Sequence, residues 1–325
     1  MVVSLRNIAY DRGILSSRSF DFPVIVVGNL NVGGTGKSPL IECLIRLLRN
    51  RYEIAVLSRG YKRKTKGFQL ANENSTASQL GDEPLQFYRK FNNILVAVDA
   101  NRVNGITSLR KLNEPPDIIL LDDAFQHRKV KPGLSLLLTS FDDIYTDDFV
   151  LPSGNLRENR KGAKRADIIV VTKCPSNISI EDRLHIKKKL KLRKQQLIFF
   201  STIVYGASLI GSNKELDVTK LDEYKVLLVT GIANSKPLEQ YLADLKIDFD
   251  HLKYRDHHNF SKLDIEKIDH KFENIKSNKK IILTTEKDYV RTFSDGNKNI
   301  YYLPIRSKII DNEENFNKEI LNYVR

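Results

Sequence analysis

The stretch that decides the fold is PVIVVGNLNVGGTGKSP, residues 23–39. Its β-branched run at residues 24–27 predicts a buried strand, and residues 40–48 have the pattern of an amphipathic helix. Between them lie a glycine-rich turn and the tripeptide Gly-Lys-Ser at residues 36–38. A strand, a glycine-rich loop, Gly-Lys-Ser and a helix in this order are typical of a phosphate-binding loop. The sequence therefore predicts that the chain binds a nucleoside triphosphate.

In such a loop the backbone N–H groups and the helix N-terminus surround a di- or triphosphate. We expect Lys37 to neutralise the β- and γ-phosphates during catalysis and the Ser38 hydroxyl to hold Mg²⁺. The predicted nucleotide-binding residues of the loop are Gly33, Gly34, Thr35, Gly36, Lys37 and Ser38. The pattern G-x-x-x-x-G-K-[ST] departs at Asn31, where Gly is usual, and Asn tolerates a left-handed backbone. The alternative is a glycine-rich turn that binds nothing.

Composition limits the class of protein. A length of 325 residues suits two domains, although one large α/β domain is an alternative, and 41% hydrophobic residues are enough for a core. Two cysteines are too few for a disulfide framework or a zinc site and suit a reducing compartment. The sequence has neither an apolar run of membrane-spanning length nor a visible signal peptide.

The chain is basic, with 53 Lys and Arg against 40 Asp and Glu and a formal net charge of +13. Such an excess favours an anionic partner, which is nucleic acid, anionic lipid or a phosphorylated substrate. The alternative is a lysine-rich solvated surface. We interpret the run KKKLKLRK at residues 187–194 as an exposed helix face.

Strands and helices alternate over the first 200 residues. Apolar runs lie at 24–27, 54–57, 94–98, 118–121, 134–138, 168–171 and 197–200, and helical stretches lie at 39–49, 83–90, 101–112 and 181–193. This alternation predicts an α/β fold with a parallel sheet and covering helices. A second α/β segment begins near residue 224 and includes a strand at 280–284. Because Gly, Ser and Asn cluster between 205 and 222, we predict a P-loop domain at 1–210 and a smaller domain at 211–325.

A second motif of phosphate chemistry is PDIILLDD at residues 116–123, a hydrophobic strand that ends in two acids. This is the Walker-B arrangement, in which a buried strand brings a carboxylate to the metal beside the phosphate-binding loop. The predicted metal site is therefore Ser38, Asp122 and Asp123. The alternative is a loop that is acidic only because loops after strands often are.

Together these motifs resemble the tetraacyldisaccharide 4'-kinase family of lipid A synthesis. The resemblance extends in family order from residue 23 to about residue 291 and includes LSRGY at 57–61, GDEP at 81–84, DDAFQHR at 122–128, LPSGNLRE at 151–158, GIA at 231–233, DHH at 256–258 and TEKD at 285–288. The chain departs from the family at Ala124, where Gly is usual. Family members also usually begin with a longer apolar and basic segment that lies on the membrane, whereas residues 1–12 precede Gly13 here.

The resemblance implies a kinase that uses ATP and Mg²⁺ to phosphorylate the 4'-hydroxyl of a tetraacylated glucosamine disaccharide 1-phosphate. It implies a P-loop α/β domain and a smaller C-terminal domain, with the active site in the cleft between them. It also implies peripheral association with the cytoplasmic face of the Gram-negative inner membrane and contact with anionic lipid. We expect no nucleic-acid partner, and the oligomeric state is left open.

A sugar hydroxyl is a poor nucleophile, so a kinase needs a base near it. Asp82 matches the family's catalytic aspartate, and His257 matches the histidine that pairs with it, with His258 as the alternative. Pro84 suits a first helical turn, which places Asp82 near a helix N-terminus. On the residues alone, Asp82 is interpretable as a helix cap, and the alternative for the two histidines is that they are surface residues beside a capping Asp256.

Four further residues lie in matching motifs: Arg102, Gln126, Arg157 and Glu158. The fork of Arg102 suits bidentate contacts with phosphate, and Arg157 and Glu158 are candidates to organise the nucleotide or the metal. The alternative for each is a structural ion pair. The basic loop at residues 58–64 either meets the substrate's phosphate and lipid headgroups or is solvated.

Without the resemblance, three classes compete: a small-molecule or lipid kinase, a P-loop GTPase or regulatory ATPase, and a nucleic-acid-binding ATPase. The strand end VVTKC at residues 170–174 lacks the Asn and Asp of the Asn-Lys-x-Asp that binds guanine. Helicase motifs and an aromatic stacking platform for bases are not found in the sequence. A kinase has Asp82 and His257 available for its acceptor and is therefore favoured.

Overall fold

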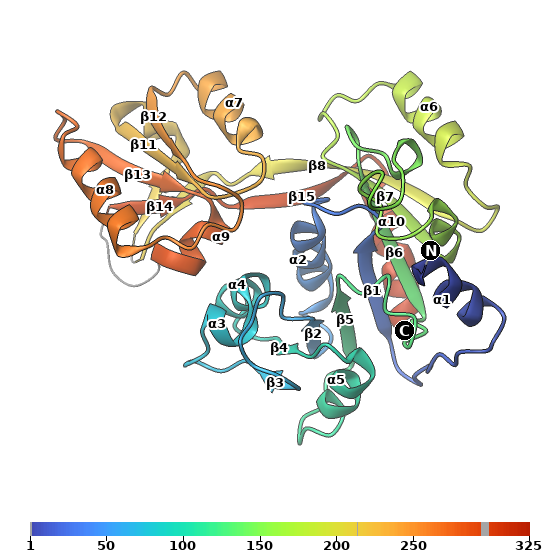
Figure 1. Cartoon of the computed structure of the whole chain (residues 1–325). Coiled ribbons are helices and arrows are strands. Elements are labelled where there is room, and N and C mark those ends of the chain that lie inside the picture. Colours follow the sequence, from blue (N-terminus) through green and yellow to red (C-terminus); the bar gives the residue numbers. More distant parts are fainter. Residues whose placement is uncertain (1, 213, 294–298) are drawn as a thin grey trace. The chain divides into compact units, whose positions relative to one another are not determined.

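The chain forms two β-sheets, each in a unit of its own (Figure 1). The structure is a computed structural model that describes residues 2–212, 214–293 and 299–325. The first unit comprises Met1–Ile203 and Arg306–Arg325, and the second comprises Val204–Ile305. The second unit is therefore inserted between two parts of the first.

The first unit contains a nine-stranded sheet in the order β15-β8-β7-β6-β1-β5-β2-β4-β3. Its strands are β1 (Val24–Asn29), β2 (Ile54–Ser58), β3 (Gln69–Leu70), β4 (Leu95–Val98), β5 (Ile118–Asp122), β6 (Leu134–Ser140), β7 (Ile168–Thr172), β8 (Leu197–Tyr205) and β15 (Ile305–Ile310). The pairs from β4 through β2, β5, β1, β6 and β7 to β8 are parallel, and β3 is antiparallel to β4. The predicted parallel sheet is thus confirmed.

Helices and short 3₁₀ turns accompany this sheet. They are α1 (Val2–Asp11), α2 (Lys37–Leu48), α3 (Ala77–Leu80), α4 (Asp82–Lys90), α5 (Arg102–Leu109), η1 (Tyr145–Asp147), η2 (Arg160–Arg165), α6 (Ile180–Leu190) and α10 (Glu313–Val324). The four predicted helical stretches are confirmed as α2, α4, α5 and α6. Within the described part of the chain, no helix has the length and apolarity needed to cross a membrane.

Hydrophobic clusters lie on both faces of the sheet. Alternate residues of a strand point to opposite faces, so Val24 and Val26 of β1 belong to one cluster and Ile25 and Val27 to the other. Helix α2 packs against β1 and β5 (Figure 1) and contributes Leu40, Ile41, Leu44, Ile45 and Leu48 to the second cluster. Strands covered on both faces have continuous apolar sequences, which is why their positions could be predicted.

Residues 306–325 belong to the first unit. The predicted division at residue 210 had placed them in the second domain. Strand β15 lies beside β8 at the edge of the sheet. Helix α10 buries Phe316, Ile320 and Val324 in the same cluster as Ile25, and the Phe316 ring packs edge-on against Phe199. Residues 306–325 therefore belong with the phosphate-binding loop, because their apolar side chains fill its core.

The second unit has a six-stranded sheet in the order β10-β9-β14-β13-β11-β12. Its elements are β9 (Ser208–Ile210), β10 (Glu215–Asp217), η3 (Val218–Glu223), β11 (Lys225–Thr230), α7 (Lys236–Asp244), β12 (Phe249–Lys253), α8 (Lys262–Glu273), β13 (Lys280–Thr284), α9 (Glu286–Asp288), η4 (Tyr289–Phe293) and β14 (Ile300–Tyr302). Strands β12, β11, β13 and β14 are parallel. The predicted strand at 280–284 is confirmed as β13.

Candidate active site

The loop between β1 and α2 has the backbone of an anion site. Gly33 and Gly36 adopt positive φ of 119° and 81°, which L side chains rarely allow. Gly36 is the N-cap of α2 and supplies no side-chain cap, so the first N–H groups of the helix remain available to an anion. The Thr172 hydroxyl at the end of β7 donates to the carbonyl of Thr35 at 2.8 Å and ties the loop to the sheet.

Asn31 does not adopt the left-handed backbone that we expected of it. The positive φ angles of the loop belong to glycines, and Asn31 is instead fully buried beside a bridge to Leu156. Its Nδ2 donates to Asp143 Oδ2 at 3.2 Å. Asn31, whose buried side chain hydrogen-bonds to the exposed Asp143, therefore replaces the usual glycine, and the explanation by left-handed tolerance is wrong.

Lys37, the first residue of α2, lies between an amide and a carboxylate. Its Nζ donates to Asn29 Oδ1 at 3.2 Å and is 3.6 Å from Asp123 Oδ1. Arg157 Nη1 contacts both oxygens of Asp123 at 2.8 and 2.7 Å. Burial raises the pKa of Asp123, but Lys37 and Arg157 outweigh it and bring the pKa below its usual value. Three predicted site residues thus form one charged cluster.

Asp122 occupies the end of β5 and is 3% exposed. The Ser58 hydroxyl at the end of β2 donates to its Oδ2 at 3.0 Å. Among the described residues, its Oδ1 is buried with no hydrogen-bond partner. Burial, followed by the charges of Glu83 and Asp123, raises the pKa of Asp122 to about 7, although Lys37 and Ser58 lower it. Lys37 therefore compensates this carboxylate only in part, and a bound cation would lower its pKa further.

Glu83 belongs to the same cluster, and the sequence analysis missed it. The Ser38 hydroxyl donates to Glu83 Oε1 at 3.2 Å, and Glu83 raises the pKa of both Asp122 and Asp123. Its position in GDEP beside Asp82 was the available signal, but only the packing of α4 shows that it reaches the loop. Asp82 is the first residue of α4, and Gly81, with φ of 96°, takes the cap position that was the alternative for Asp82.

These oxygens fit a magnesium ion. Mg²⁺ is usually held by one or two carboxylates together with substrate phosphates and water. The buried Oδ1 of Asp122, the Ser38 hydroxyl and Glu83 supply hard oxygen ligands of this kind. Across the described ranges, no group of three or more His, Cys, Asp or Glu side chains forms a metal cage by itself. The residues therefore suit a metal that is shared with a nucleotide rather than a dedicated protein site.

Arg102 begins α5 and is only 2% exposed. Its guanidinium donates to the carbonyls of Asp99 at 2.9 Å and Asp122 at 3.2 Å. Burial lowers its pKa to about 10, although Asp122 and Asp123 raise it, so it stays charged at neutral pH. Within the described chain, its buried Nε has no hydrogen-bond partner. Its observed contacts position the Asp122 backbone, and its role toward phosphate stays a prediction.

Gln126 and Glu158 lie in a separate network beside the end of β1. Gln126 Nε2 donates to the carbonyl of Asn29 at 2.8 Å and to Glu158 Oε1 at 3.1 Å. Arg165 and Asn7 donate to Glu158 at 2.7 and 2.6 Å. These protein partners account for the burial of Glu158, which is 1% exposed. The predicted nucleotide role of both residues remains a prediction.

The two histidines lie in the second unit and differ in environment. His258 Nε2 is 3.0 Å from Asp264 Oδ2, and its ring stacks on Tyr254 with centroids 4.8 Å apart. His257 has a left-handed backbone with φ of 54° and a side chain 30% exposed, 4.0 Å from Asp256. His258 is therefore a packed residue, and His257 is the more exposed of the pair.

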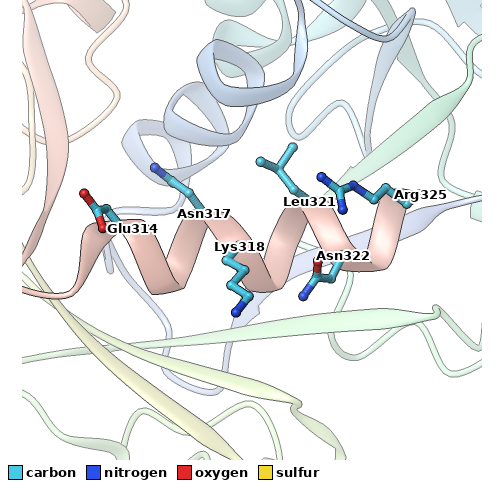
Figure 2. Close-up of a pocket in the computed structure, with 6 residues that line it drawn as sticks. All are labelled: Glu314, Asn317, Lys318, Leu321, Asn322 and Arg325. Carbon is cyan, nitrogen blue, oxygen red and sulfur yellow. The ribbon is translucent and has the colours of Figure 1, made fainter.

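Two other features lie apart from this cluster. In the basic loop, Arg63 donates to the carbonyls of Val98 and Gly67, whereas Tyr61 is 67% exposed. A hollow of about 380 Å³ lies along α10, and Figure 2 shows the residues that line it. It is lined by Glu314, Asn317, Lys318, Leu321, Asn322 and Arg325, none of which is a predicted site residue.

Ala124, the departure from the family pattern, does not strain the site. The positive φ in this turn, 47°, belongs to Asp123. Ala124 is 4% exposed and packs in the core. A methyl group is therefore accommodated where the family usually has glycine.

Sequence comparisons identify relatives over the whole chain. A family model described as Tetraacyldisaccharide-1-P 4'-kinase matches residues 1–325. The chain is 53% identical over 327 residues to the tetraacyldisaccharide 4'-kinase of Flavobacterium johnsoniae, covering 100% of this chain and 94% of the relative. It is 45% identical over 342 residues to the protein of the same name from Bacteroides thetaiotaomicron, covering 100% and 90%.

A solved structure has the same fold. It is the "apo" form of LpxK from Aquifex aeolicus in complex with ATP, with a TM-score of 0.79 and 29% sequence identity. The similarity covers 100% of this chain and 95% of that one. The predicted α/β fold is confirmed by this neighbour.

Proposed function

Because the chain belongs to the Tetraacyldisaccharide-1-P 4'-kinase family, we propose that it transfers a phosphoryl group from ATP to the 4'-hydroxyl of a tetraacylated glucosamine disaccharide 1-phosphate. The observation that supports this reaction is the charged cluster of Lys37, Asp122 and Asp123 at the phosphate-binding loop. Another small-molecule kinase or a regulatory NTPase is not favoured, because the family match extends over the whole chain.

The phosphate-binding loop supplies the donor side. We assign the backbone of residues 33–38 to the phosphates of ATP, since the glycine angles and the α2 N-terminus present N–H groups there. Lys37 would shift from Asn29 and Asp123 to the phosphate charge. Asp122, with Ser38 and Glu83, would hold Mg²⁺, which when bound neutralises charge on the phosphate oxygens. Arg157 keeps Asp123 ionised and oriented.

Asp82 is our candidate for the acceptor side. It lies one residue before Glu83, so α4 carries a metal-side carboxylate and the proposed base on neighbouring positions of its first turn. We propose that Asp82 accepts or orients the proton of the 4'-hydroxyl. We assign His257 of the second unit to the same reaction as its partner, because it is the more exposed histidine and matches the family motif.

We also propose that the protein acts peripherally at the cytoplasmic face of the inner membrane. Leu5 and Ile8 of α1 are 59% and 43% exposed, and Ile14, which follows the helix, is 72% exposed. Arg6 and Arg12 lie between them in the sequence and are exposed. Exposed apolar side chains beside cations suit the surface of an anionic bilayer.

The direct test of the reaction is incubation of the purified protein with ATP, Mg²⁺ and the disaccharide 1-phosphate lipid, followed by mass spectrometry. The expected result is a gain of one phosphate by the lipid. A lipid in which the 4'-hydroxyl is replaced by hydrogen is the matched control and should stay unchanged. A folded protein that hydrolyses ATP but does not phosphorylate the lipid would refute the proposed reaction.

A further inference from the structure

The loop that carries His257 is held by the backbone of one glycine. Gly231 directly follows β11, and its carbonyl accepts a hydrogen bond of 3.0 Å from the His257 N–H. The His257 backbone is left-handed, with φ of 54°, a conformation that is unfavourable for an ordinary L-residue. Such a residue persists only where its surroundings hold it. The Gly231 carbonyl is one of the groups that do so.

Gly231 is in turn held from its other side by Asp288. The Asp288 side chain is completely buried, and its Oδ2 accepts from the Gly231 N–H at 2.9 Å. The same oxygen accepts from the Thr285 hydroxyl at 2.7 Å, and Oδ1 accepts from Arg291. A buried carboxylate with donors on both oxygens is a rigid acceptor. Asp288 therefore anchors the peptide that holds His257.

Gly231 is closely packed between Asp288 and His258. A Cβ added at Gly231 would lie 3.1 Å from Asp288 Oδ1 and 3.4 Å from the Cβ of His258. The neighbouring His258 is fixed separately, by Asp264 and the Tyr254 ring. The two histidines are thus linked to different acids: Asp264 contacts the side chain of His258, whereas Gly231 links Asp288 to the backbone of His257.

We propose that Asp288 is a positioning residue for His257 and acts through the backbone of Gly231. The inference rests on the proposed function, in which His257 serves the acceptor side. Strands β11, β12 and β13 are parallel, so Gly231, the 254–260 loop and α9 all follow the same edge of the second sheet. The link lies entirely within the second unit. Asp288 should therefore affect the rate of transfer and leave ATP binding alone.

The test compares Asp288→Asn and Gly231→Ala in the full-length enzyme. The single carbonyl oxygen of Asn can replace Oδ2, which accepts from Gly231 and Thr285, or Oδ1, which accepts from Arg291, but not both, so the side chain must shift against the Gly231 peptide. A Cβ at residue 231 would lie 3.1 Å from Asp288 Oδ1 and would press on the same contact. We expect each variant to lower kcat by roughly tenfold to a hundredfold, the range that a misplacement of about 1 Å produces. The ATP Kd should change by less than about twofold. Asp217→Asn is the matched control, because Asp217 caps Thr219 elsewhere in the same unit, and it should leave kcat unchanged.

A second readout separates positioning from general stability. In a His257→Ala background, Asp288→Asn should cause no further loss of kcat, since the side chain that it is proposed to position is gone. Losses that multiply would overturn the proposal. In ¹⁵N-histidine NMR spectra, Asp288→Asn should shift the ring signals of His257 and leave those of His258 in place.

The same spectra distinguish the two proposals. If His257→Ala retains full kcat, the assigned role of His257 fails, whereas a shifted His257 signal in Asp288→Asn would still show the positioning link. An unshifted His257 signal would refute the link whatever the activity. If Asp288→Asn proves unstable, Gly231→Ala provides both measurements without removing the carboxylate.

Discussion

The Ser58 hydroxyl donates a hydrogen bond of 3.0 Å to Oδ2 of Asp122, and this is the neutral contact that supports a buried acid. Asp122 Oδ1 has no hydrogen-bond partner among the residues that the structure describes. Burial and the charges of Glu83 and Asp123 raise the Asp122 pKa to about 7. In the metal-free protein, ionisation of Asp122 is therefore unfavourable, and it should lower the free energy of unfolding.

Stability of the metal-free protein should fall as the pH rises toward 7. The folded-state pKa of Asp122 is raised from 3.8 to about 7, so between these values the folded state binds more protons than the unfolded state. The contribution is then fully present below about pH 4 and is lost as the pH rises through 7. Thermal melts in EDTA across this range should show the fall, and Mg²⁺ should raise the Tm more at pH 8 than at pH 6.

The matched variant is Asp122→Asn, which keeps an acceptor for Ser58 and removes the charge. It should be more stable than the wild type at pH 8 without metal, lose the Mg²⁺ response and lose kinase activity. An Asp122→Asn protein with the same pH and Mg²⁺ dependence as the wild type would show that another group is responsible.

Lys37→Ala should lower kcat by on the order of 10²–10³-fold, the cost typical of removing one charge-stabilising group from a transition state. The fold should survive, because the side chain lies at the loop and is not part of either core cluster. Phosphate transfer to the lipid is the measurement, and Lys111→Ala on an exposed turn is the control. Near-normal turnover in Lys37→Ala would mean that the loop is structural.

Asp82 and His257 should act as a unit. Substitution of either by Ala should reduce kcat and leave the ATP Kd nearly intact, since the lost interaction belongs to the transition state. The double variant should be little worse than the worse single variant. A double-mutant cycle on kcat, with ATP affinity measured alongside, decides the matter. If the two losses multiply, or if ATP binding weakens, the pairing is wrong, and His258 is the next residue to replace.

Gly28→Ala should destabilise the first unit by about 1–3 kcal/mol, the usual range for overpacking. A Cβ at Gly28 would lie 2.6 Å from the Phe125 Cβ and 3.0 Å from the Phe125 N. The glycine thus allows the turn after β5, which carries Asp123, to approach β1. Gly34→Ala is the control for urea unfolding, because its Cβ would meet no atom within 4 Å. Equal stability of the two variants would contradict the close approach.

Replacement of Leu5 and Ile8 by Ser should weaken binding to anionic vesicles. Both side chains are exposed on α1, and each surface cation nearby adds on the order of 1 kcal/mol at an anionic bilayer, an effect that salt screens. Co-sedimentation with vesicles of varied anionic lipid content and salt is the measurement. Ile180→Ser on α6, where the side chain is also exposed, is the control. Binding that does not change with lipid charge, with salt or with the Leu5 and Ile8 substitutions would refute the proposal.

The strands and helices of the first unit could be predicted because buried parallel strands have continuous apolar sequences. The predicted runs coincide with β1, β2 and β4–β8. The return of residues 306–325 could not be predicted, because β15 alternates exposed and buried residues and carries no signal for which sheet it joins. Sheet membership depends on long-range pairing rather than on local pattern.

The donor side of the site was predictable for a similar reason: its residues lie in one motif or at the end of one strand. Glu83 was not, because its carboxylate reaches Ser38 only through the packing of α4. For Gln126 and Glu158, the motif predicted a contact with the nucleotide. The partners that the structure shows for them are Asn29, Arg165 and Asn7. A motif identifies residue types and spacing, but it does not indicate which neighbour a side chain contacts.

The return of α10 to the first unit also sets an order of assembly during translation. The ribosome makes β1 and its loop early, whereas Phe316, Ile320 and Val324, which pack in the same core cluster as Ile25, emerge only after the second unit. The whole second unit must be synthesised before the phosphate-binding unit can close its core. A nascent chain that stalls within residues 204–305 would therefore expose Ile25 and Leu40 to chaperones, and deleting residues 313–325 would unfold the nucleotide side of the enzyme.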